Sequence, residues 1–313
     1  MRWIKKGKIF DQSSDIDFSH SHAALPSPYI IEGGTIRIFY ATRDEEQRSR
    51  ITFIDVEERD PSRIKYIHDK PIFELGGMGT FDDRGATPSG LFNINGRNFF
   101  YYNGYNIGDL ARYRIAVGVA EIDAEFSLAD KLSSGPVQDR NMDDPCGVAT
   151  PFVIYDKRIA RYVIFYTSFT HWKTINGDEE PFYRIVRAES EDGLSWFNKS
   201  ICIDFDSSTD GGIVRPTVIY ADERYHMWYS IRSNSGYRED LAASYRIKYA
   251  YSANGIDWVK SSEAAIEPST NKGDWDHDMT AYPYVLETSE NTYMFYNGNG
   301  FGKSGFGYAV LEK

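Results

Sequence analysis

The sequence predicts an all-β protein, a five-bladed β-propeller with four-stranded antiparallel blades, and three observations support this. A short apolar run containing proline occurs five times, an aromatic doublet follows each run, and a third strand-like run follows each doublet. Because one such sheet cannot bury both of its faces, the repeats must pack against one another, and radial repetition protects their edges. We therefore expect residues 1–313 to form a single propeller domain.

The first two strands of each repeat are marked by proline and by the doublet. The prolines that introduce the apolar runs are Pro28, Pro88, Pro151, Pro216 and Pro283. The doublets, each followed by a small or polar residue, are Phe39-Tyr40, Tyr101-Tyr102, Phe165-Tyr166, Trp228-Tyr229 and Phe295-Tyr296. Their second residues lie 62, 64, 63 and 67 positions apart, a spacing that fixes the length of the repeat.

The third strand of two repeats leads into a tight turn and then into a tryptophan. The dipeptides Asp192-Gly193 and Asn254-Gly255 supply the positive φ angles of such hairpins, and Trp196 and Trp258 follow them. Each tryptophan is expected to begin a fourth strand. The loops expected between second and third strands cover 43–49, 105–112, 171–182 and 233–244, and the best helical candidate is a short turn at 127–132.

The two ends of the chain are expected to complete each other. The fifth repeat stops after its third strand, whereas the sequence from Trp3 resembles the sequence from Trp258. We expect residues 3–9 to add the outer strand to the last blade and so close the ring. The alternative is an independent N-terminal strand.

Composition and charge exclude several classes of protein. The formal net charge is −11, so no basic face for nucleic acid is expected. Cys146 and Cys202 imply no disulfide framework. No apolar stretch approaches the roughly 18 residues of a membrane span, and the first residues lack the apolar region of a secretory signal. The expected location is cytoplasmic.

Carboxylates recur just before the innermost strands, where five segments should converge on the propeller axis. Four blades carry an aspartate five to eight residues before the proline, and the candidates for catalysis are Asp83, Asp144, Asp210 and Asp278. Like charges in one concave site raise one another's pKa, and an acid beside an ionised base is what cleavage of a glycosidic bond requires. The alternative for each aspartate alone is ordinary turn chemistry.

Other side chains near these segments are candidates for binding substrate. Arginines suit a phosphate or a sugar carboxylate, histidines suit acid chemistry or a metal, and aromatic rings stack on sugars. The candidates are His22, Arg84, Arg215, Trp275, His277 and Tyr282. For each, the alternative is a structural role, as neutralising partner of an aspartate or as filling between blades. No metal site is predicted and no cofactor is required, although an ion on the axis is left open.

Together, the proline-containing inner strands, the doublets and the turn from Ser190 to Trp196 resemble the five-bladed propeller glycosidases. These are glycoside hydrolase families 43 and 32 and the related family 130 phosphorylases. The resemblance implies a glycoside in an axial pocket and acidic residues from different blades. The chain departs from these families because no acidic residue stands one or two positions before an inner-strand proline, and no glutamate lies on the ring.

The resulting functional hypothesis is a glycoside hydrolase that acts on a glycan or oligosaccharide. Asp83 or Asp278 would be the general base, and Asp144 or Asp210 would be an acid or would tune a pKa, with His22 or His277 as substitute acid. The alternatives are a glycoside phosphorylase or glycosyltransferase on the same scaffold, and a glycan-binding propeller without catalysis.

Overall fold

The computed structural model describes residues 1–12 and 18–312, which form twenty strands and one short helical turn, α1 (Asn299–Gly302). The predicted all-β class and its four-stranded antiparallel sheets are confirmed. Among the described residues, no helix is long and apolar enough to cross a membrane. Cys146 and Cys202 are free thiols, as expected.

The strands fall into groups of four that follow the chain. The first group is β2 (Ser21–Ile31), β3 (Thr35–Arg43), β4 (Ser49–Glu57) and β5 (Ile64–Ile67). The second group is β6 (Ala86–Ile94), β7 (Arg97–Ile107), β8 (Tyr113–Ile122) and β9 (Ala129–Lys131).

The next eight strands form one continuous sheet that divides naturally into two groups. The third group is β10 (Gly147–Asp156), β11 (Arg161–Ile175), β12 (Asp178–Ser190) and β13 (Phe197–Ile203). The fourth group is β14 (Asp210–Ala221), β15 (Arg224–Ser233), β16 (Arg246–Ser252) and β17 (Val259–Ile266). A single parallel pair, Tyr183 with Gly212, joins them, whereas every other pairing in the sheet is antiparallel.

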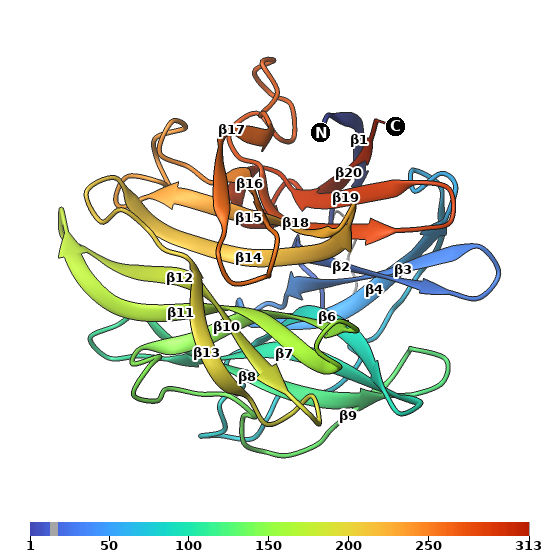
Figure 1. The fold of residues 1–313 in the computed structure, drawn as a ribbon, viewed down its shortest axis with the longest axis horizontal. Coiled ribbons are helices and arrows are strands. Elements are labelled where there is room, and N and C mark those ends of the chain that lie inside the picture. The colour runs from blue at the N-terminus through green and yellow to red at the C-terminus, as the bar shows by residue number, and fades with distance from the viewer. Residues whose placement is uncertain (13–17, 313) are drawn as a thin grey trace.

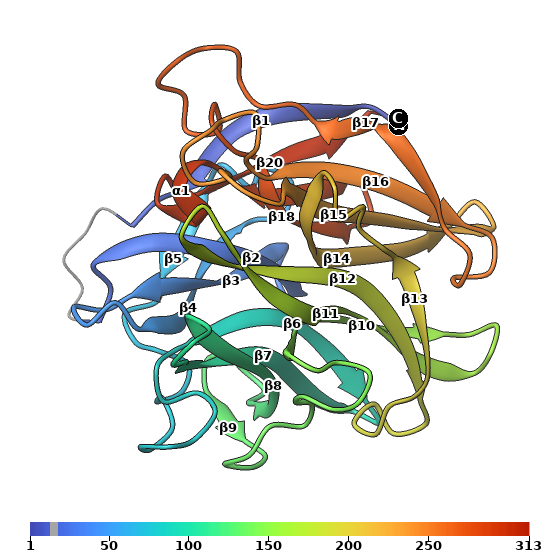
Figure 2. The ribbon, with the colours of Figure 1, turned by 90° about the vertical axis from the view of Figure 1, so that its left-hand side faces the viewer.

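The fifth group takes its outer strand from the beginning of the chain. It contains β18 (Ala281–Glu287), β19 (Thr292–Asn297), β20 (Phe306–Leu311) and β1 (Trp3–Phe10). Strand β1 pairs antiparallel with β20, from Trp3 opposite Leu311 to Phe10 opposite Phe306. The two ends of the chain consequently lie side by side, as Figures 1 and 2 show.

Each group packs its faces against the groups before and after it. Five buried apolar clusters of the described chain join the first group to the second, the second to the third, the third to the fourth, the fourth to the fifth, and the fifth back to the first. In Figures 1 and 2 the groups follow one another in the order of the colours. The core is thus distributed between sheets rather than gathered in one place.

The aromatic doublets recur because they supply both of these interfaces. Successive side chains of a strand point to opposite faces of its sheet. Phe39 accordingly packs toward the second group, and Tyr40 packs toward the fifth. The same division holds for Tyr101 and Tyr102, and for the doublets of the other three groups.

The prolines lie within the inner strands, at bulges, rather than at the strand starts. Register shifts occur at this place in β2, β6, β10, β14 and β18. Bulges are sites where a strand accepts proline, which has no N–H for the ladder. In the first group the bulge falls at Pro26, so Pro26 and not Pro28 is the equivalent of the other four prolines.

In four inner strands the residue before the bulge proline has a positive φ angle, and its N–H is bonded to the neighbouring group. Leu25, Thr150, Arg215 and Tyr282 have φ angles of 56°, 47°, 60° and 56°. Their amides donate to Asn297 Oδ1 (2.7 Å), Asn103 Oδ1 (2.6 Å), Thr150 Oγ1 (3.2 Å) with Thr167 Oγ1 (3.4 Å), and Ser230 Oγ (2.8 Å). Asn103, Thr167, Ser230 and Asn297 are the residues that follow the doublets.

The second group provides the exception that explains this contact. Ala41 follows the first doublet and has no side-chain acceptor, and Thr87, which precedes Pro88, is absent from the residues with positive φ. The polar residue after the doublet therefore satisfies a backbone N–H that the bulge would otherwise leave unpaired.

Two local expectations were wrong. Residues 171–182 are not a loop, because β11 and β12 continue as an extended hairpin that turns at Asn176-Gly177. The segment 127–132 is not helical, because residues 129–131 form β9 at the edge of the second group.

Candidate functional site

A cavity of about 490 Å³ lies where the connections between second and third strands meet the starts of the inner strands. Its lining combines basic and aromatic side chains from all five groups. The basic ones are His22, Arg43, Arg84, Arg112 and Arg238. The aromatic ones are Tyr105, Tyr113, Tyr183, Tyr237, Tyr245, Tyr282 and Phe301.

The expected crowd of carboxylates in this cavity is not found. No aspartate or glutamate is among the residues of 1–12 and 18–312 that line it, so Asp83, Asp144, Asp210 and Asp278 are all outside the lining. Asp15 and Asp17, which precede the first inner strand, lie outside the described residues. The recurrence of aspartate in the sequence therefore needs another explanation.

That explanation is a structural unit that repeats with the fold. A buried aspartate accepts a hydrogen bond from the tyrosine at the second position of the doublet in its own group, and it pairs with a lysine of the outer strand. The three units are Asp82 with Tyr102 (3.5 Å) and Lys131 (2.5 Å), Asp144 with Tyr166 (3.1 Å) and Lys199 (2.8 Å), and Asp276 with Tyr296 (2.9 Å) and Lys5 (2.6 Å). Burial, with the neighbouring carboxylate, raises the pKa of each of these tyrosines.

These units correct the interpretation of Asp144. Its carboxylate is buried and bonded to Tyr166, Lys199 and Asn141, so it ties the first strand of its group to the second and the fourth. Lys199 also pairs with the exposed Asp143 at 3.4 Å, so it neutralises both carboxylates at this place. Its position in the sequence is equivalent to those of Asp82 and Asp276 because the repeated fold needs the same tie.

The other three predicted catalytic residues have partners of their own. Asp83 accepts hydrogen bonds from the Gly79 amide (2.9 Å) and from Asn106 Nδ2 (2.8 Å), and Asn106 lines the cavity. Asp210 accepts from the amide of Asp206 (3.1 Å) within a turn. Asp278 is about half exposed and lies 3.9 Å from His277. Asp83 is thus the one of the four that contacts the wall of the cavity.

Arg215 is a buried structural cross-link rather than a ligand-binding side chain. Its guanidinium donates to the carbonyl of Pro88 (2.9 Å), to Ser27 Oγ (2.6 Å) and to the carbonyl of Pro26 (3.3 Å). It therefore ties the fourth group to the first and the second, and it is 2 % exposed. Burial lowers the pKa of Arg215 to about 10.

Trp275 and His277 are also used within the fold. The ring of Trp275 packs 5.1 Å from that of Tyr296 and closes over the glycines at 298 and 307. His277 Nδ1 lies 2.8 Å from the carbonyl oxygen of Ser269. Neither residue lines the cavity. Both belong to the segment that leads into the fifth group.

Three predicted binding residues do line the cavity: His22, Arg84 and Tyr282. His22 and Tyr282 have φ angles of 65° and 56°, conformations that non-glycine residues adopt at a cost. Burial, together with the charges of Arg43 and Lys303, lowers the pKa of His22 to about 4. At neutral pH its imidazole is accordingly uncharged and able to accept a proton.

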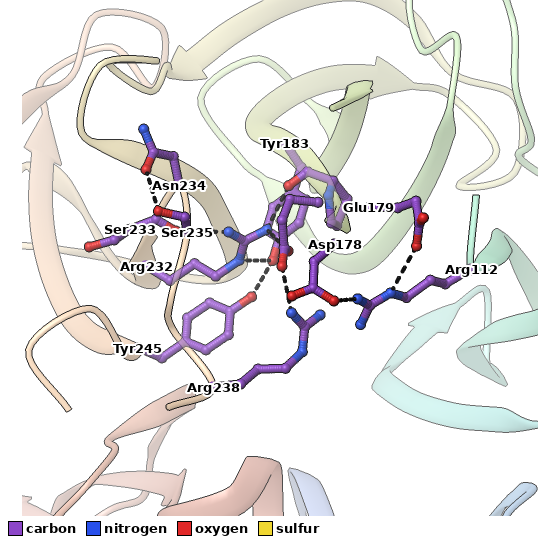
Figure 3. A network of polar contacts seen from close by, with 12 residues as sticks. Arg112, Asp178, Glu179, Tyr183, Arg232, Ser233, Asn234, Ser235, Arg238 and Tyr245 are labelled. Atoms are coloured by element: carbon purple, nitrogen blue, oxygen red, sulfur yellow. Dashed lines mark hydrogen bonds and ion pairs between the residues drawn. The ribbon is translucent and has the colours of Figure 1, made fainter. Parts of the chain in front are cut away.

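Two of the cavity arginines are held by carboxylates of the β11–β12 hairpin. Arg112 pairs with Asp178 and with Glu179 (3.4 Å), as Figure 3 shows. Arg238 pairs with Glu180 (2.6 Å). Glu180 is buried, and it also lies 4.0 Å from the buried Arg232. The hairpin therefore fixes basic side chains that come from the second and fourth groups.

The same network positions two tyrosines of the cavity. Arg232 Nε donates to the Tyr183 hydroxyl at 3.0 Å, and the hydroxyls of Tyr183 and Tyr245 are hydrogen-bonded to each other (Figure 3). The guanidinium of Arg232 lies 3.9 Å from the ring centroid of Tyr237. Burial raises the pKa of Tyr245 well above its usual value. These rings are thus rigid parts of the wall that present hydroxyls and ring faces.

Sequence reasoning missed Arg43, Arg112, Arg238 and most of these tyrosines. In an antiparallel meander, the connection from the second to the third strand lies at the same end as the entry to the first. Three of the four connections expected from the sequence, 43–49, 105–112 and 233–244, contribute directly to the lining. The arginines and tyrosines in these three connections were therefore a signal from which the cavity lining could have been predicted.

A metal centre finds no support in the described residues, because no group of three or more histidine, cysteine, aspartate or glutamate side chains is placed to hold an ion. The cavity carries an excess of positive groups instead. Its chemistry suits an anionic or hydroxyl-rich organic ligand.

The fold is that of the propeller glycoside hydrolases. The chain superposes on a putative glycosidase from Bacteroides thetaiotaomicron with a TM-score of 0.70 at 12% identity, covering 98% of this chain and 96% of the other. For a thermostable family-43 glycoside hydrolase the TM-score is 0.67 at 16% identity, covering 94% of this chain and 89% of the other. For an alpha-L-arabinofuranosidase from Lactobacillus brevis the TM-score is 0.66 at 13% identity, covering 94% of this chain and 92% of the other. At these identities the likeness establishes the fold alone.

The chain belongs to the same family as two proteins of Mycobacterium tuberculosis. They are uncharacterized protein Rv1502 of strain ATCC 25618 / H37Rv and uncharacterized protein MT1551 of strain CDC 1551 / Oshkosh. Each is 34% identical over 314 residues, covering 100% of both chains. No known protein-family model matches the sequence.

Proposed function

We propose that this chain is a carbohydrate-active protein that binds a saccharide in the cavity and acts on its glycosidic bond. The scaffold behind this proposal is a single domain of five blades, closed into a ring by β1. The pairing of β1 with β20 and the packing of the fifth group on the first support closure. The five interfaces between successive groups support the count of five blades.

The observation that carries the function is the aromatic and hydroxyl-rich lining at this end of a glycosidase-like fold. Seven aromatic rings face one cavity, and six of them carry a hydroxyl. Aromatic faces pack against the apolar faces of sugar rings, and hydroxyls exchange hydrogen bonds with those of a sugar. A volume of about 490 Å³ is within the range of small-ligand sites.

Two groups at the cavity are the candidates for proton exchange with a bound saccharide. His22 lies in the cavity wall and is uncharged at neutral pH, and Asp83 lies behind the wall, bonded to Asn106. In hydrolysis, a water attacks the anomeric carbon, loses a proton to a base, and the departing oxygen takes up a proton as its bond to carbon breaks. We assign the base role to Asp83, which is hydrogen-bonded to Asn106 of the cavity wall.

A second candidate function is a glycoside phosphorylase or a glycosyltransferase, and the four cavity arginines favour it. Phosphorolysis uses phosphate in place of water, and a planar guanidinium binds phosphate through two parallel hydrogen bonds. Hydrolysis needs no such groups. Glycan binding without catalysis is the third possibility, and it agrees with a lining that has no carboxylate in the described chain.

The test is turnover of a panel of aryl-glycosides and oligosaccharides, with and without inorganic phosphate. Product without phosphate indicates a hydrolase, and product only with phosphate indicates a phosphorylase. Asp83→Asn should abolish turnover, whereas the control Asp210→Asn should leave it unchanged, because Asp210 does not line the cavity and its carboxylate is hydrogen-bonded to Asp206 and Thr209. Saccharide binding without product would support glycan binding and would reject catalysis.

A further inference from the structure

We propose that the cavity holds a negatively charged group of its ligand, a phosphate or a carboxylate, between Arg43 and Arg84. This inference deepens the proposed function and rests on it, because it states which class of saccharide the cavity takes. Four arginines and a histidine line the cavity, and no acidic residue of the described chain lines it. The chain as a whole has a net charge of −11, so this excess of positive charge is local.

The four arginines differ in whether the protein neutralises them. Arg112 and Arg238 are paired with carboxylates of the β11–β12 hairpin. The side chains of Arg43 and Arg84 have neither a hydrogen bond nor an ion pair within residues 1–12 and 18–312. A guanidinium cannot lose its charge near neutral pH, so these two remain open to an external anion.

The acidic neighbours of these two arginines in the chain are bound elsewhere. Asp44 follows Arg43, but its carboxylate bonds Arg48 at 2.9 Å. Asp83 precedes Arg84, but its carboxylate accepts from the Gly79 amide and from Asn106. The idea that Arg84 neutralises neighbouring aspartates is therefore not supported by any contact. Both arginines line the cavity, and neither has a counter-ion within the part of the chain that the structure describes.

Backbone pairing brings the two arginines to either side of one residue. Arg43 ends β3 and is paired with Ser49, the first residue of β4. Ser49 in turn forms a parallel bridge with Gly85, next to Arg84. Adjacent strands lie about 5 Å apart, so the two arginine backbones are roughly 10 Å apart, a distance that two arginine side chains can close around one anion. Ser49 also lines the cavity and adds a hydroxyl between them.

Glycine at position 85 keeps this approach close. A Cβ there would lie 2.9 Å from the amide nitrogen of Ser49, and the φ angle of Gly85 is +147°. The first and second groups thus meet here by backbone contact, which fixes the spacing of the two arginines. Rigid elements that hold their ligand groups at a set spacing are what a specific site requires.

The aromatic part of the lining indicates the rest of the ligand. Tyr237, Tyr245, Tyr282 and Phe301 come from the fourth and fifth groups and pack on one another. Arg43, Arg84 and Ser49 come from the first and second groups. The cavity thus offers two unpaired arginines from the first and second groups, and aromatic rings that come mainly from the fourth and fifth groups but include Tyr105 and Tyr113 of the second. A sugar phosphate or a uronic acid has both matching features, an anionic group for the arginines and a sugar ring for the aromatic side chains.

The experiment is calorimetric titration at constant ionic strength with glucose, glucose 1-phosphate, glucuronate and inorganic phosphate as probes. We expect the charged sugars to bind at least tenfold more tightly than glucose. The ranking of glucose 1-phosphate against glucuronate separates phosphate from carboxylate as the preferred group. Binding of inorganic phosphate alone at comparable strength would identify a free anion as the ligand of the arginine site.

The variants Arg43→Gln and Arg84→Gln should each weaken the charged probes by about tenfold or more and leave glucose unchanged, since each removes a charge-assisted hydrogen bond. Arg97→Gln is the matched control, because Arg97 is exposed and begins β7, whereas the cavity residues of that strand lie at its far end. The control should bind every probe as the unaltered protein does.

The outcomes separate this inference from the proposed function. If glucose binds as tightly as its charged forms and neither arginine variant matters, the charged site is refuted and the saccharide function stands. If phosphate binds through the arginines but no sugar binds, the charged site stands and the saccharide function is refuted. If no probe binds, both are refuted.

Discussion

Replacing Asn297 with alanine tests how strongly the last blade is held to the first. Asn297 Oδ1 accepts the amide of Leu25 at 2.7 Å, and Asn297 Nδ2 donates to the carbonyls of Ala23 (2.7 Å) and Gly305 (2.9 Å). All of these atoms are buried. The variant therefore leaves the buried Leu25 amide without a partner and removes the hydrogen bonds to both carbonyls.

The expected cost follows from those three hydrogen bonds. A buried backbone group that loses its partner costs about 1–3 kcal/mol, and the Leu25 amide has no alternative acceptor in the described structure. With the loss of the two hydrogen bonds to carbonyls, we expect Asn297→Ala to lower the free energy of unfolding by about 3 kcal/mol. Asn297→Asp should be no less destabilising, because it keeps the acceptor for Leu25 but places a buried carboxylate oxygen against the carbonyl oxygens of Ala23 and Gly305.

The assay is urea denaturation followed by circular dichroism and by tryptophan fluorescence. Asn271→Ala serves as the control, because Asn271 is exposed and its side chain makes no hydrogen bond in the described chain. The control should change the free energy of unfolding by less than about 0.5 kcal/mol. An equally small change for Asn297→Ala would refute the argument that the polar residue after the doublet holds neighbouring groups together.

Three further predictions follow from the contacts above. Asp144→Asn should lower the free energy of unfolding by about 2 kcal/mol in urea denaturation, because it leaves Lys199 without its buried partner; no loss would contradict the structural assignment. The pKa of His22 falls on folding, so the unfolded chain binds more protons and stability should decline as pH falls from about 6.5 to about 4. His22→Asn, which tolerates the positive φ, should reduce that decline, and an unchanged pH profile would contradict it. Gly118→Ala should lower the melting temperature by several degrees, because a Cβ would lie 2.3 Å from the ring of Tyr102; an unchanged melting temperature would mean that the ring moves freely.

Much of the fold could be predicted because its determinants are local and repeat. The doublets indicate strands that bury both faces, and Asp192-Gly193 indicates a hairpin. The structure bears out that hairpin in detail, since Ser190 Oγ accepts the Gly193 amide at 2.8 Å and Asp192 Oδ1 accepts the amides of Leu194 and Ser195. The pairing of β1 with β20 was also accessible, because the tryptophan motif at the start of the chain matches the outer strand of the fourth group.

The site was harder to predict, because repetition in sequence has two possible causes. Residues at equivalent positions can converge on one cavity, or they can perform the same structural task once in each repeat. Asp144 belongs to the second case, and the partner that reveals this, Lys199, lies 55 positions away on an outer strand. A short window around the aspartate contains neither the lysine nor the tyrosine.

The arginines illustrate the same difficulty from the other side. Arg215 follows the pattern of a binding residue, yet its positive φ angle and its bonds to Pro88 and Ser27 bury it in the centre of the fold. Arg43 looks like an ordinary loop residue in the sequence. Only the pairing through Ser49 places it beside Arg84, and such a contact between repeats depends on the tertiary structure.

The most direct test of this account is a crystal structure of the protein grown with glucose 1-phosphate or glucuronate. The account predicts the sugar ring against Tyr237, Tyr245 and Tyr282, with the charged group between Arg43 and Arg84. A sugar bound at another surface, with this cavity empty at saturating concentration, would contradict it.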